Sequence, residues 1–567
     1  MDAKEVIIKS LEAALGGLGV TGIVPEVKLS DKSENGDYYT NVAMRIAGVL
    51  HEKPLDIAYK IKSSLDTLDT PDTHGTFQRV DVAPPGFINF TLSKKYLSNI
   101  IAGVMADADK FGKTDLLKSE KIMIEFTDPN PFKEFHIGHL YVNIVGESLC
   151  RMYEAIGGDV QRVCYQGDVG LHVAKAIFGM QALHDQMPVD SAPINIKAQF
   201  LGKAYANGAT KFEESDATKQ EIYKINKAVY EKDPSIVDLY RKGRTWSLEY
   251  FETIYKRLGM KFEHYYFESE VQKIGTDLVR EYLKKGIFEE SDGAIIFPGK
   301  KFGLHNRVFI NSLGLPTYEA KDMGLAGVKY KDFAYDKSII ITGQEQAEYF
   351  KVIIKALSQI NPDLAAKTSH IANGLVRLPT GKMSSRTGDV ITGEWLMDEA
   401  VGRIQKEFPD MDDVTAEKVG MAAIKFALLK SAIGGNIEFN FDDSIALSGA
   451  SGPYIQYTYV RTQSVLRKGV KDSGEKIKDI AENDINSEEA NLMRHISYYP
   501  EVVSIAAEKL SPNLVAEYLF ALSQKFNFFY QKHKIGENQF RLDLTMAVGI
   551  TLKNGLKLLG IETVEKM

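Results

Sequence analysis

The feature that most constrains this chain is a strand pattern followed directly by a helix pattern, with DPNPFKEFHIGHL (128–140) between them. The run KIMIEFT before this segment is apolar and β-prone, which indicates a buried strand. The run LYVNIVGESLCRMYEAIG has apolar residues at helical spacing and stops at Gly157 and Gly158. The segment is therefore a strand-to-helix crossover, where backbone N–H groups and the helix dipole attract anions.

The chain as a whole divides into regions of different pattern. Strand-like runs such as IMIEFT, DVQRVCYQ, GAIIFP and SIIITG alternate with helical stretches, which is typical of a parallel α/β sheet. The beginning of the chain combines helices with alternating strands, and helical patterns dominate its end. At 567 residues the chain is too long for one core. We expect three domains, an α+β domain at 1–112, an α/β domain at 113–400 with a helical insertion near 195–256, and a helical bundle at 401–567.

Composition excludes several classes of protein. A hydrophobic content of 44% with no apolar run of about 18–20 residues predicts a protein without membrane helices. The acid-containing N-terminus is unlike a secretory signal. Two cysteines, Cys150 and Cys164, exclude a disulfide framework and a four-thiolate zinc site, and favour a reducing cytoplasm. The net charge of −7 still permits one basic groove for nucleic acid.

The two histidines of the crossover admit three interpretations. His136 and His139 could bind a metal at spacing i, i+3, but no HExxH glutamate or third ligand is close in the sequence. They could also simply cap the start of a helix. The functional interpretation is that both donate hydrogen bonds to phosphate oxygens as charge builds in a transition state. Gly138 between them would let a base or ribose approach the backbone.

A second motif, GKMSSRTGD (381–389), follows late in the α/β region. Alone, a short loop of this composition is most often a solvated surface. HIGH followed about 240 residues later by KMSSR, however, resembles the class I aminoacyl-tRNA synthetases, in which the pair binds ATP on a Rossmann-type fold. The resemblance implies Mg²⁺ bound with the triphosphate and no structural metal. It implies an ATP site made of His136, Gly138, His139, Lys382, Ser384 and Arg386.

Longer stretches resemble one family within that class. IEFTDPNPFKEFHIGHL is similar to the opening of arginyl-tRNA synthetase catalytic domains, and NVAMRIA, PGFINF, LPTYEAKD and GASGPYIQYTYVRTQSVLRK continue the resemblance over nearly the whole chain. It implies that L-arginine and ATP form arginyl-adenylate and that arginine then passes to tRNA(Arg). It also implies an N-terminal tRNA-binding domain, a C-terminal anticodon-binding bundle, a monomer and a cytoplasmic location.

The arginine pocket is expected to contain carboxylates, because a guanidinium is a planar, donor-only group. By resemblance, Glu125 and Asp322 accept the guanidinium, and Tyr318 lies four residues before Asp322 in the same motif. Asn130 and Gln346 match positions that hold the α-amino and α-carboxylate groups. Without the resemblance, an ion pair between Asp322 and Lys321, or a place at a helix start, would be the simpler interpretation.

Several positions depart from the family pattern. Asp128 replaces a common serine in the arginine site, where its carboxylate either attracts the α-ammonium group or faces away. Val169 and His172 stand where tryptophan and glutamine are usual, and Tyr349 stands where histidine is usual.

Two sets of cations complete the expected site residues. The usual KMSKS loop has a second lysine that helps neutralise the triphosphate, and here that position is Ser385. Lys133 matches a lysine that family members lacking the second KMSKS lysine carry just before HIGH, so we count it with His136, His139 and Lys382 as catalytic. The expected tRNA contacts in the bundle are Arg461, Arg467 and Lys468, on a stretch without acids.

Two rival functions remain at this point. A non-catalytic tRNA-binding relative would keep the fold without the chemistry, although both motifs and both guanidinium acceptors are present here. A different class I ligase would need other pocket chemistry. A cysteinyl enzyme needs zinc-binding thiols, and a glutamyl enzyme needs cations in its side-chain pocket.

Overall fold

The computed structural model describes residues 3–30, 35–67, 75–378, 391–469 and 485–567. Residues 381–389, which contain the KMSSR motif, therefore lie outside the described residues. The chain forms two compact units. The first contains Met1–Gly112, Thr458–Val502 and Tyr518–Asn554, and the second contains Lys113–Tyr457, Val503–Glu517 and Gly555–Met567.

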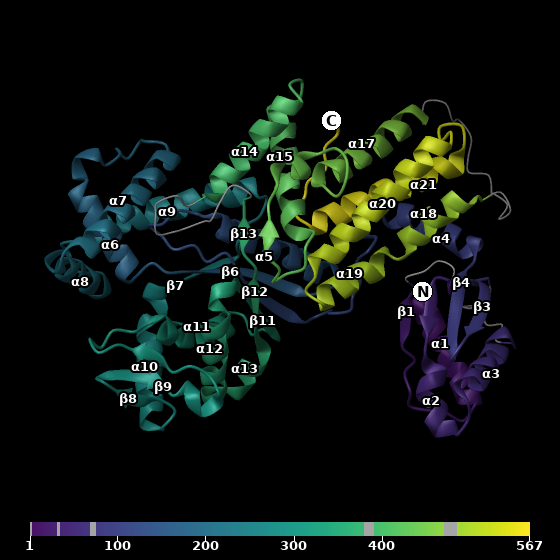
Figure 1. The fold of residues 1–567 in the computed structure, drawn as a ribbon, viewed down its shortest axis with the longest axis horizontal. Helices are drawn as coiled ribbons and strands as arrows, with labels where there is room; N and C mark the ends of the chain where they lie inside the picture. Colours follow the sequence, from purple (N-terminus) through teal and green to yellow (C-terminus); the bar gives the residue numbers. More distant parts are fainter. Residues whose placement is uncertain (1–2, 31–34, 68–74, 379–390, 470–484) are drawn as a thin grey trace. The chain divides into compact units, whose positions relative to one another are not determined.

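The N-terminal part of the first unit is an antiparallel sheet of strand order β1-β2-β4-β3 with helices packed on it (Figure 1). Inward-facing residues alternate along FINFTL in β4, so one face of this strand is buried. The strands are β1 (Val27–Leu29), β2 (Tyr38–Thr40), β3 (Phe77–Ala83) and β4 (Phe87–Leu92). The helices are α1 (Ala3–Gly17), α2 (Val42–Leu50), α3 (Pro54–Thr67) and α4 (Lys94–Asp107).

The first unit also contains helices from the end of the chain. The buried carboxylate of Asp37 joins the two parts, because it accepts from Tyr498 Oη at 2.6 Å and pairs with Arg494 Nε at 3.1 Å. The helices are α17 (Gly452–Gly469), α18 (Ser487–Ser497), α19 (Tyr499–Glu508), α20 (Pro512–Lys532) and α21 (Gln539–Leu558). Four of these, α17, α19, α20 and α21, have residues in both units, so the three-domain division stays a prediction.

A parallel five-stranded sheet of order β12-β11-β5-β6-β7 forms the centre of the second unit. The strand order reverses at β5, so the carboxyl end of β5 is the topological switch point where α/β sheets bind ligands. Helix α5 (Ile137–Ala155) begins just beyond that end. The strands are β5 (Lys121–Glu125), β6 (Asp159–Gln166), β7 (His264–Phe267), β11 (Lys337–Gly343) and β12 (Thr368–Asn373).

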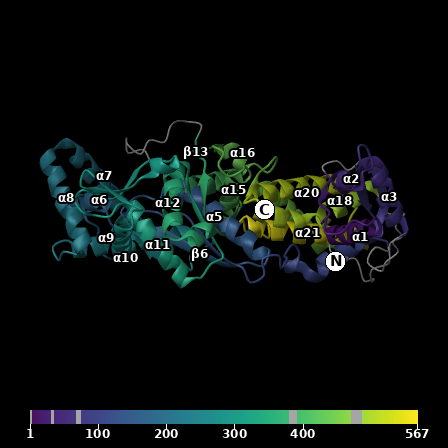
Figure 2. The same ribbon diagram turned by 90° about the horizontal axis from the view of Figure 1, so that it is seen from below.

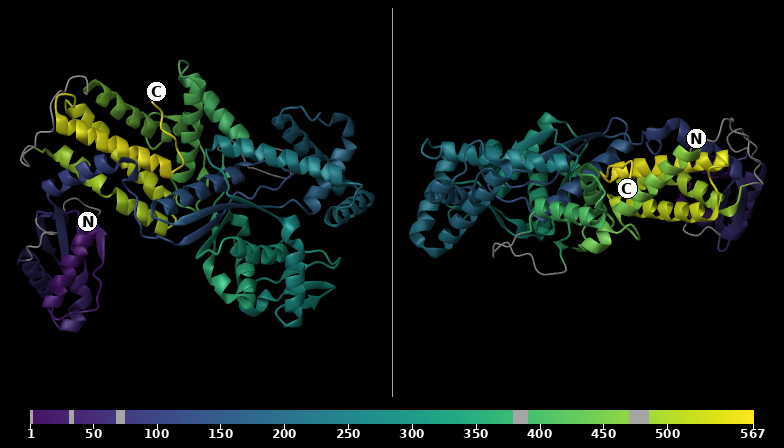
Figure 3. Two further views of the ribbon diagram at one scale, coloured as in Figure 1. Left: turned by 180° about the vertical axis from the view of Figure 1, so that it is seen from behind. Right: turned by 90° about the horizontal axis from the view of Figure 1, so that it is seen from above.

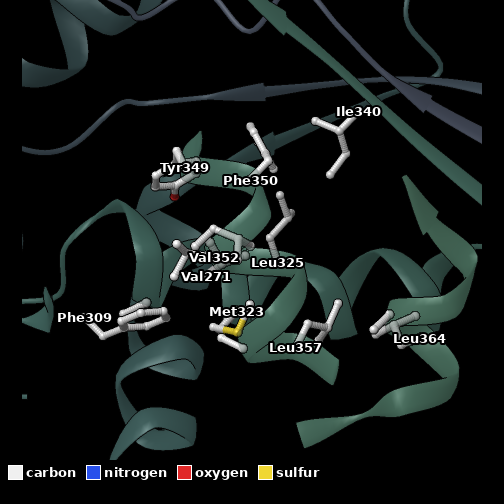
Figure 4. Close-up of a cluster of buried hydrophobic side chains, with 14 of the residues drawn as sticks. Val271, Phe309, Met323, Leu325, Ile340, Tyr349, Phe350, Val352, Leu357 and Leu364 are labelled. Atoms are coloured by element: carbon white, nitrogen blue, oxygen red, sulfur yellow. The ribbon is translucent and has the colours of Figure 1, made fainter. Parts of the chain in front are cut away.

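One predicted strand of the parallel sheet lies elsewhere. GAIIFP forms β9 of a separate antiparallel sheet of order β10-β9-β8, because Asp292 and Gly293 both have positive φ and turn the chain back as a hairpin. Figure 3 shows this sheet grouped with the neighbouring helices, and Figure 4 shows their shared core around Phe309, Met323 and Leu357. The elements are β8 (Glu289–Ser291), β9 (Ala294–Phe297), β10 (Arg307–Ile310), α10 (Glu268–Lys284), α11 (Tyr318–Asp332), α12 (Ala347–Ile360) and α13 (Pro362–Lys367).

The predicted insertion corresponds to α7 (Ile194–Glu214), α8 (Asp216–Glu231) and α9 (Val237–Arg257). They lie beside α6 (Leu171–Ala182) in Figures 1 and 2. Helices α6 and α7 approach closely through two glycines. A Cβ on Gly179 would lie 1.8 Å from Ala204 O, and one on Gly208 would lie 1.9 Å from Lys175 O.

The second unit ends in further helices and a short parallel strand pair. These elements are β13 (Val376–Arg377), α14 (Gly393–Glu407), α15 (Asp413–Leu429), β14 (Ile437–Glu438) and α16 (Phe441–Ile445). Helix α15 packs on α5, the helix that follows the crossover, and so supports it from behind. Across the described ranges, none of the helices is both long and apolar enough to cross a membrane.

Candidate active site

The crossover between β5 and α5 has an unusual backbone. Thr127, Asp128 and Phe132 all have positive φ, at 78°, 45° and 68°, a region that non-glycine residues seldom adopt. Hydrogen bonds hold this conformation, from Phe132 N to Ser247 Oγ at 2.8 Å and from Asn143 Nδ2 to Thr127 Oγ1 at 2.9 Å. Such strain persists where the surrounding structure enforces it, and it concentrates at functional sites.

His136 and His139 cap the start of α5 reciprocally. His136 Nδ1 accepts from the backbone N–H groups of Gly138 and His139 at 3.1 and 3.3 Å, and His139 Nδ1 accepts from His136 N at 3.3 Å. The two rings stack with centroids 3.6 Å apart. Because each Nδ1 is an acceptor, each neutral ring carries its proton on Nε2 and has that N–H left as a donor. Capping and ligand binding are thus compatible roles.

Both histidines are held neutral. Burial, with a contribution from the charge of Lys133, lowers the pKa of His136 to about 4. Burial and the neighbouring His136 lower the pKa of His139 well below its ordinary value. At neutral pH the HIGH step therefore offers uncharged N–H donors at a helix N-terminus, a suitable surface for phosphate oxygens.

Lys133 lies at one side of the HIGH step, with its Nζ 5.1 Å from the centre of the Tyr205 ring on α7. Burial and the charge of Lys175 lower its pKa. A cleft of about 220 Å³ opens beside it, and Tyr250, Thr392 and Asn195 also line this cleft. The lysine therefore faces a space shared by the crossover, the insertion and the chain that follows the KMSSR motif.

Lys382, Ser384, Ser385 and Arg386 lie outside the described residues, but the chain just after them is placed. Ile391 O accepts from Ile137 N at 3.0 Å, and Gly393 N donates to Phe135 O at 2.7 Å. Thr392 forms an isolated bridge with His136. The segment that leaves the KMSSR motif is therefore attached to the HIGH step itself.

Glu125 and Asp128 lie at the carboxyl end of β5. Glu125 Oε2 is paired with Lys329 Nζ at 2.7 Å, and both side chains are almost completely buried. Asp128 Oδ1 accepts from the backbone N–H of Tyr165 in β6 at 2.7 Å. Burial and then the charge of Glu125 raise the pKa of Asp128 well above its ordinary value.

Asp322 on α11 approaches the same acids. Its Oδ2 accepts from Tyr349 Oη at 2.6 Å, whereas the neighbouring Lys321 pairs with Glu268 at 2.6 Å. The simple ion pair between Asp322 and Lys321 is thus wrong. Burial raises the pKa of Asp322 well above its ordinary value, Glu125 raises it further, and the hydrogen bond from Tyr349 opposes the rise.

The other predicted arginine contacts are more dispersed. Asn130 lies against Gly167, where an added Cβ would be 2.3 Å from Asn130 Oδ1. Tyr318 begins α11 and is 51% exposed. Gln346 is exposed at the end of the short helix η5 (Gln344–Gln346). The structure therefore brings Glu125, Asp128 and Asp322 together, and the arginine-binding roles of all six residues stay predictions.

Two residues near this site did not stand out in the sequence. Lys329 lies two helical turns after Asp322, on the same face of α11, so the helical period could have revealed it. Tyr349 stood out only as a departure from the family histidine. Of the other departures, His172 bonds Gly167 O at 2.8 Å through Nε2, and burial lowers its pKa to about 3. Val169 packs in the core of the insertion.

The three cations expected to contact tRNA lie on α17. Arg461 is half-buried, donates to Asn527 Oδ1 and has its Cζ 5.0 Å from the centre of the Tyr530 ring. Arg467 and Lys468 are exposed near the end of the helix. Within the described part of the chain, no three His, Cys, Asp or Glu side chains are grouped to hold a metal ion.

A parallel sheet with a HIGH step at its switch point defines a class I aminoacyl-tRNA synthetase catalytic domain. The family model of tRNA synthetases class I (R), catalytic domain, matches residues 101–441. The arginyl tRNA synthetase N terminal domain matches 2–92, and the DALR anticodon binding domain matches 455–567.

Curated relatives and solved structures agree. The chain is 30% identical to an arginine–tRNA ligase of Streptococcus suis over 100% of both chains. It is 31% identical to that of Flavobacterium psychrophilum over 85% of each. The arginyl-tRNA synthetase structures of Thermus thermophilus (TM-score 0.79, 22% identity, 99% of this chain and 100% of that one) and Plasmodium falciparum (0.77, 21%, 99% of both) share its fold.

The chain belongs to the arginyl-tRNA synthetase family. This membership confirms the predicted fold class and the predicted aminoacyl-tRNA ligase activity for arginine. It also implies the use of ATP.

Proposed function

We propose that this chain joins L-arginine to ATP at the carboxyl end of β5, forms arginyl-adenylate there, and transfers arginine to the 3′ end of tRNA(Arg). The observation that carries the proposal is the excess of acids at this place. Glu125, Asp128 and Asp322 lie together, and the ion pair of this group within the described residues joins Lys329 to Glu125. In the described part of the chain, the hydrogen bonds that Asp128 and Asp322 accept come from neutral donors.

This charge balance favours a cationic substrate. The raised pKa values of Asp128 and Asp322 mean that ionising both without a cation is unfavourable. A guanidinium relieves that repulsion and can donate two parallel hydrogen bonds to one carboxylate. One carboxylate oxygen of Glu125 is already paired with Lys329. Asp322 is therefore the better-placed acceptor for the guanidinium, and Glu125 mainly adds negative charge.

The other half of the site is suited to ATP. The Nε2–H groups of His136 and His139 donate to phosphate oxygens as charge moves onto the leaving pyrophosphate, and Gly138 lets the nucleotide approach α5. Lys133 and, from the KMSSR motif, Lys382, Ser384 and Arg386 supply further donors. Mg²⁺ enters with the triphosphate as part of the substrate. Positioning and electrostatics account for the reaction, and no covalent enzyme intermediate is required.

Binding of tRNA is assigned to separate surfaces. The exposed cations Arg467 and Lys468, with Arg461 beside them, suit phosphate contacts on α17. The N-terminal α+β part is a second tRNA-binding surface by family resemblance. We further propose that the protein acts as a cytoplasmic monomer, as the resemblance implies.

ATP–pyrophosphate exchange with each of the twenty amino acids, with and without tRNA, tests the proposal. We expect exchange with arginine alone, and its loss in Asp322→Asn while ATP binding is kept. Exchange with a different amino acid would overturn the assignment of the pocket. Absence of any exchange or tRNA charging, with tRNA binding retained, would support the non-catalytic relative instead.

A further inference from the structure

Tyr349 contacts the proposed guanidinium acceptor directly. It lies on α12, is 8% exposed, and donates from Oη to Asp322 Oδ2 at 2.6 Å. Figure 4 shows it at the edge of the core cluster that also contains Phe350 and Val352. The ring is therefore held by packing while its hydroxyl group reaches a carboxylate, an arrangement that fixes the direction of the hydrogen bond.

Arg307, a cation over the Tyr349 ring, is paired with an acid other than Asp322. Arg307 Cζ lies 5.0 Å from the centre of the Tyr349 ring, and Arg307 Nη1 donates to Glu319 Oε1 at 3.1 Å. Lys321, adjacent to Asp322 in the chain, is paired with Glu268. Arg307, Lys321 and Lys329 are thus each paired with another acid.

We propose that Tyr349 is a positioning residue for arginine specificity, which holds Asp322 so that its Oδ1 and its full negative charge remain available to the substrate guanidinium. The inference rests on the proposed function and adds the origin of its selectivity. A neutral donor orients the carboxylate without neutralising it. A protein cation in the same place would compete with the substrate for the charge.

The surroundings of Asp322 make this hydrogen bond important. The titratable groups that act on it are Glu125 from β5, Asp128 from the crossover, Glu268 from α10, Glu319 from its own helix, and Tyr165 and Tyr349. The acids among them all discourage ionisation of Asp322, and the hydroxyl group of Tyr349 favours it. Removal of that hydroxyl group should therefore raise the pKa of Asp322 further and weaken arginine binding most at low pH.

The test compares Tyr349→Phe, Tyr349→His and the control Tyr266→Phe, which removes a hydroxyl group from the same core cluster but not the one that Asp322 accepts. In aminoacylation with saturating tRNA, Tyr349→Phe should raise KM for arginine about 10- to 100-fold, the range for a hydrogen bond to a charged group. Its kcat and its KM for ATP should stay within about threefold of the wild-type values, because the lost hydrogen bond stabilises bound arginine equally in the ground state and in the transition state. The acid limb of kcat/KM for arginine should shift to higher pH.

Two further readouts separate positioning from a structural role. Citrulline, the neutral isostere of arginine, should inhibit wild type and Tyr349→Phe almost equally, so the preference for arginine over citrulline falls. Tyr349→His should restore a low KM near pH 8, where imidazole is a neutral donor. That rescue should be lost below about pH 6.5, where the imidazolium competes with the substrate.

An unchanged KM and acid limb in Tyr349→Phe would overturn the inference, as would an equal change in Tyr266→Phe. A Tyr349→Phe variant that unfolds leaves Tyr349→His to decide, and absence of rescue near pH 8 would then count against positioning. These results are distinct from failure of the proposed function, which would appear as wild-type enzyme that does not activate arginine.

Discussion

Two buried charge clusters in the second unit differ in how their acids are matched. In the matched cluster, Arg162 from β6 donates to Glu147 at 2.7 Å and to Glu154 at 2.6 Å, and Arg151 donates to Glu147 at 2.6 Å. In the acid-rich cluster of Glu125, Asp128, Asp322 and Lys329, the two aspartates accept hydrogen bonds from neutral donors of the described residues.

The electrostatic consequences are opposite. Burial disfavours the charge on Arg162, yet hydrogen bonds to Glu154 and Glu147 raise its pKa above the ordinary value. At Asp128 and Asp322, burial and neighbouring acids raise the carboxyl pKa values and discourage ionisation. The comparison indicates that the matched cluster has its charges paired within the fold, whereas the acid-rich cluster has an excess of acids that the proposed guanidinium substrate would balance.

The largest expected effect on folding stability comes from breaking the matched cluster. Arg162→Met leaves Glu147 buried with only part of its partners, so the free energy of unfolding should fall by about 3 kcal/mol, the lower end for a broken buried pair. Urea unfolding of the second unit measures this. Lys273→Met, at the exposed Lys273–Asp277 pair, is the control and should hardly change the midpoint. Equal urea midpoints for Arg162→Met and Lys273→Met would mean that the pairing of Arg162 with its acids contributes no stability.

Lys133→Ala tests the phosphate side of the site. If Lys133 substitutes for the lysine absent at Ser385, the rate of adenylate formation should fall about 10²- to 10³-fold, as for loss of one preorganised donor. Arginine affinity should barely move. Single-turnover adenylate formation with tRNA present measures this.

The double variant supplies the control for that result. Ser385→Lys in the Lys133→Ala background should recover part of the rate, because the two cations would act on the same phosphates. Additive effects without rescue would assign Lys133 another role, such as contact with the tRNA acceptor end.

Asp322→Asn alters the acid-rich cluster itself. The asparagine amide keeps the shape of the carboxylate but presents N–H donors toward a guanidinium, which can only donate. The transition-state stabilisation measured by kcat/KM for arginine should therefore fall by roughly 2–4 kcal/mol. ATP binding and the cooperative unfolding transition should be retained. Arginine kinetics within threefold of wild type would place the pocket elsewhere.

The same substitution predicts a pH effect of definite sign. Because folding raises the pKa of Asp322, its contribution to stability is present below the ordinary aspartate pKa and is lost as the pH rises through the folded value. Without arginine, Asp322→Asn should therefore gain stability relative to wild type as the pH rises above the ordinary aspartate pKa and toward the raised folded value. Thermal unfolding across that range measures the difference, and saturating arginine should reduce it. A difference in stability between Asp322→Asn and wild type that does not change with pH would contradict the raised pKa of Asp322.

The smallest effect is expected at the exposed cations of α17. Arg467→Gln with Lys468→Gln should weaken tRNA binding and lower the slope of log K against log salt by roughly one unit per lost phosphate contact. Arginine and ATP binding should not change. Arg461→Gln is tested separately, because Arg461 also contacts Asn527 and Tyr530 within the bundle. An unaltered slope in the double variant would exclude this surface.

The crossover could be predicted from the sequence because its signals are local. Apolar residues mark β5, the HIGH step lies at the start of α5, and Gly157 follows its end, as expected from spacing and helix-stop rules. The strand GAIIFP was assigned to the wrong sheet, because an apolar run predicts a strand but does not identify its neighbours. The two-residue turn at Asp292 and Gly293 pairs this strand with β8 as a hairpin.

The sequence by itself determined the residue types of the site, namely two histidines on a helix start and carboxylates for a guanidinium. Only the tertiary structure decided which of these carboxylates is paired with a lysine and which accept neutral donors. Lys329 engages Glu125 across 204 residues, the N–H of Tyr165 engages Asp128 across 37, and Tyr349 engages Asp322 across 27. Capping and periodicity act over a few residues and are visible in the sequence, whereas ion pairing depends on contacts between elements that are distant in the chain.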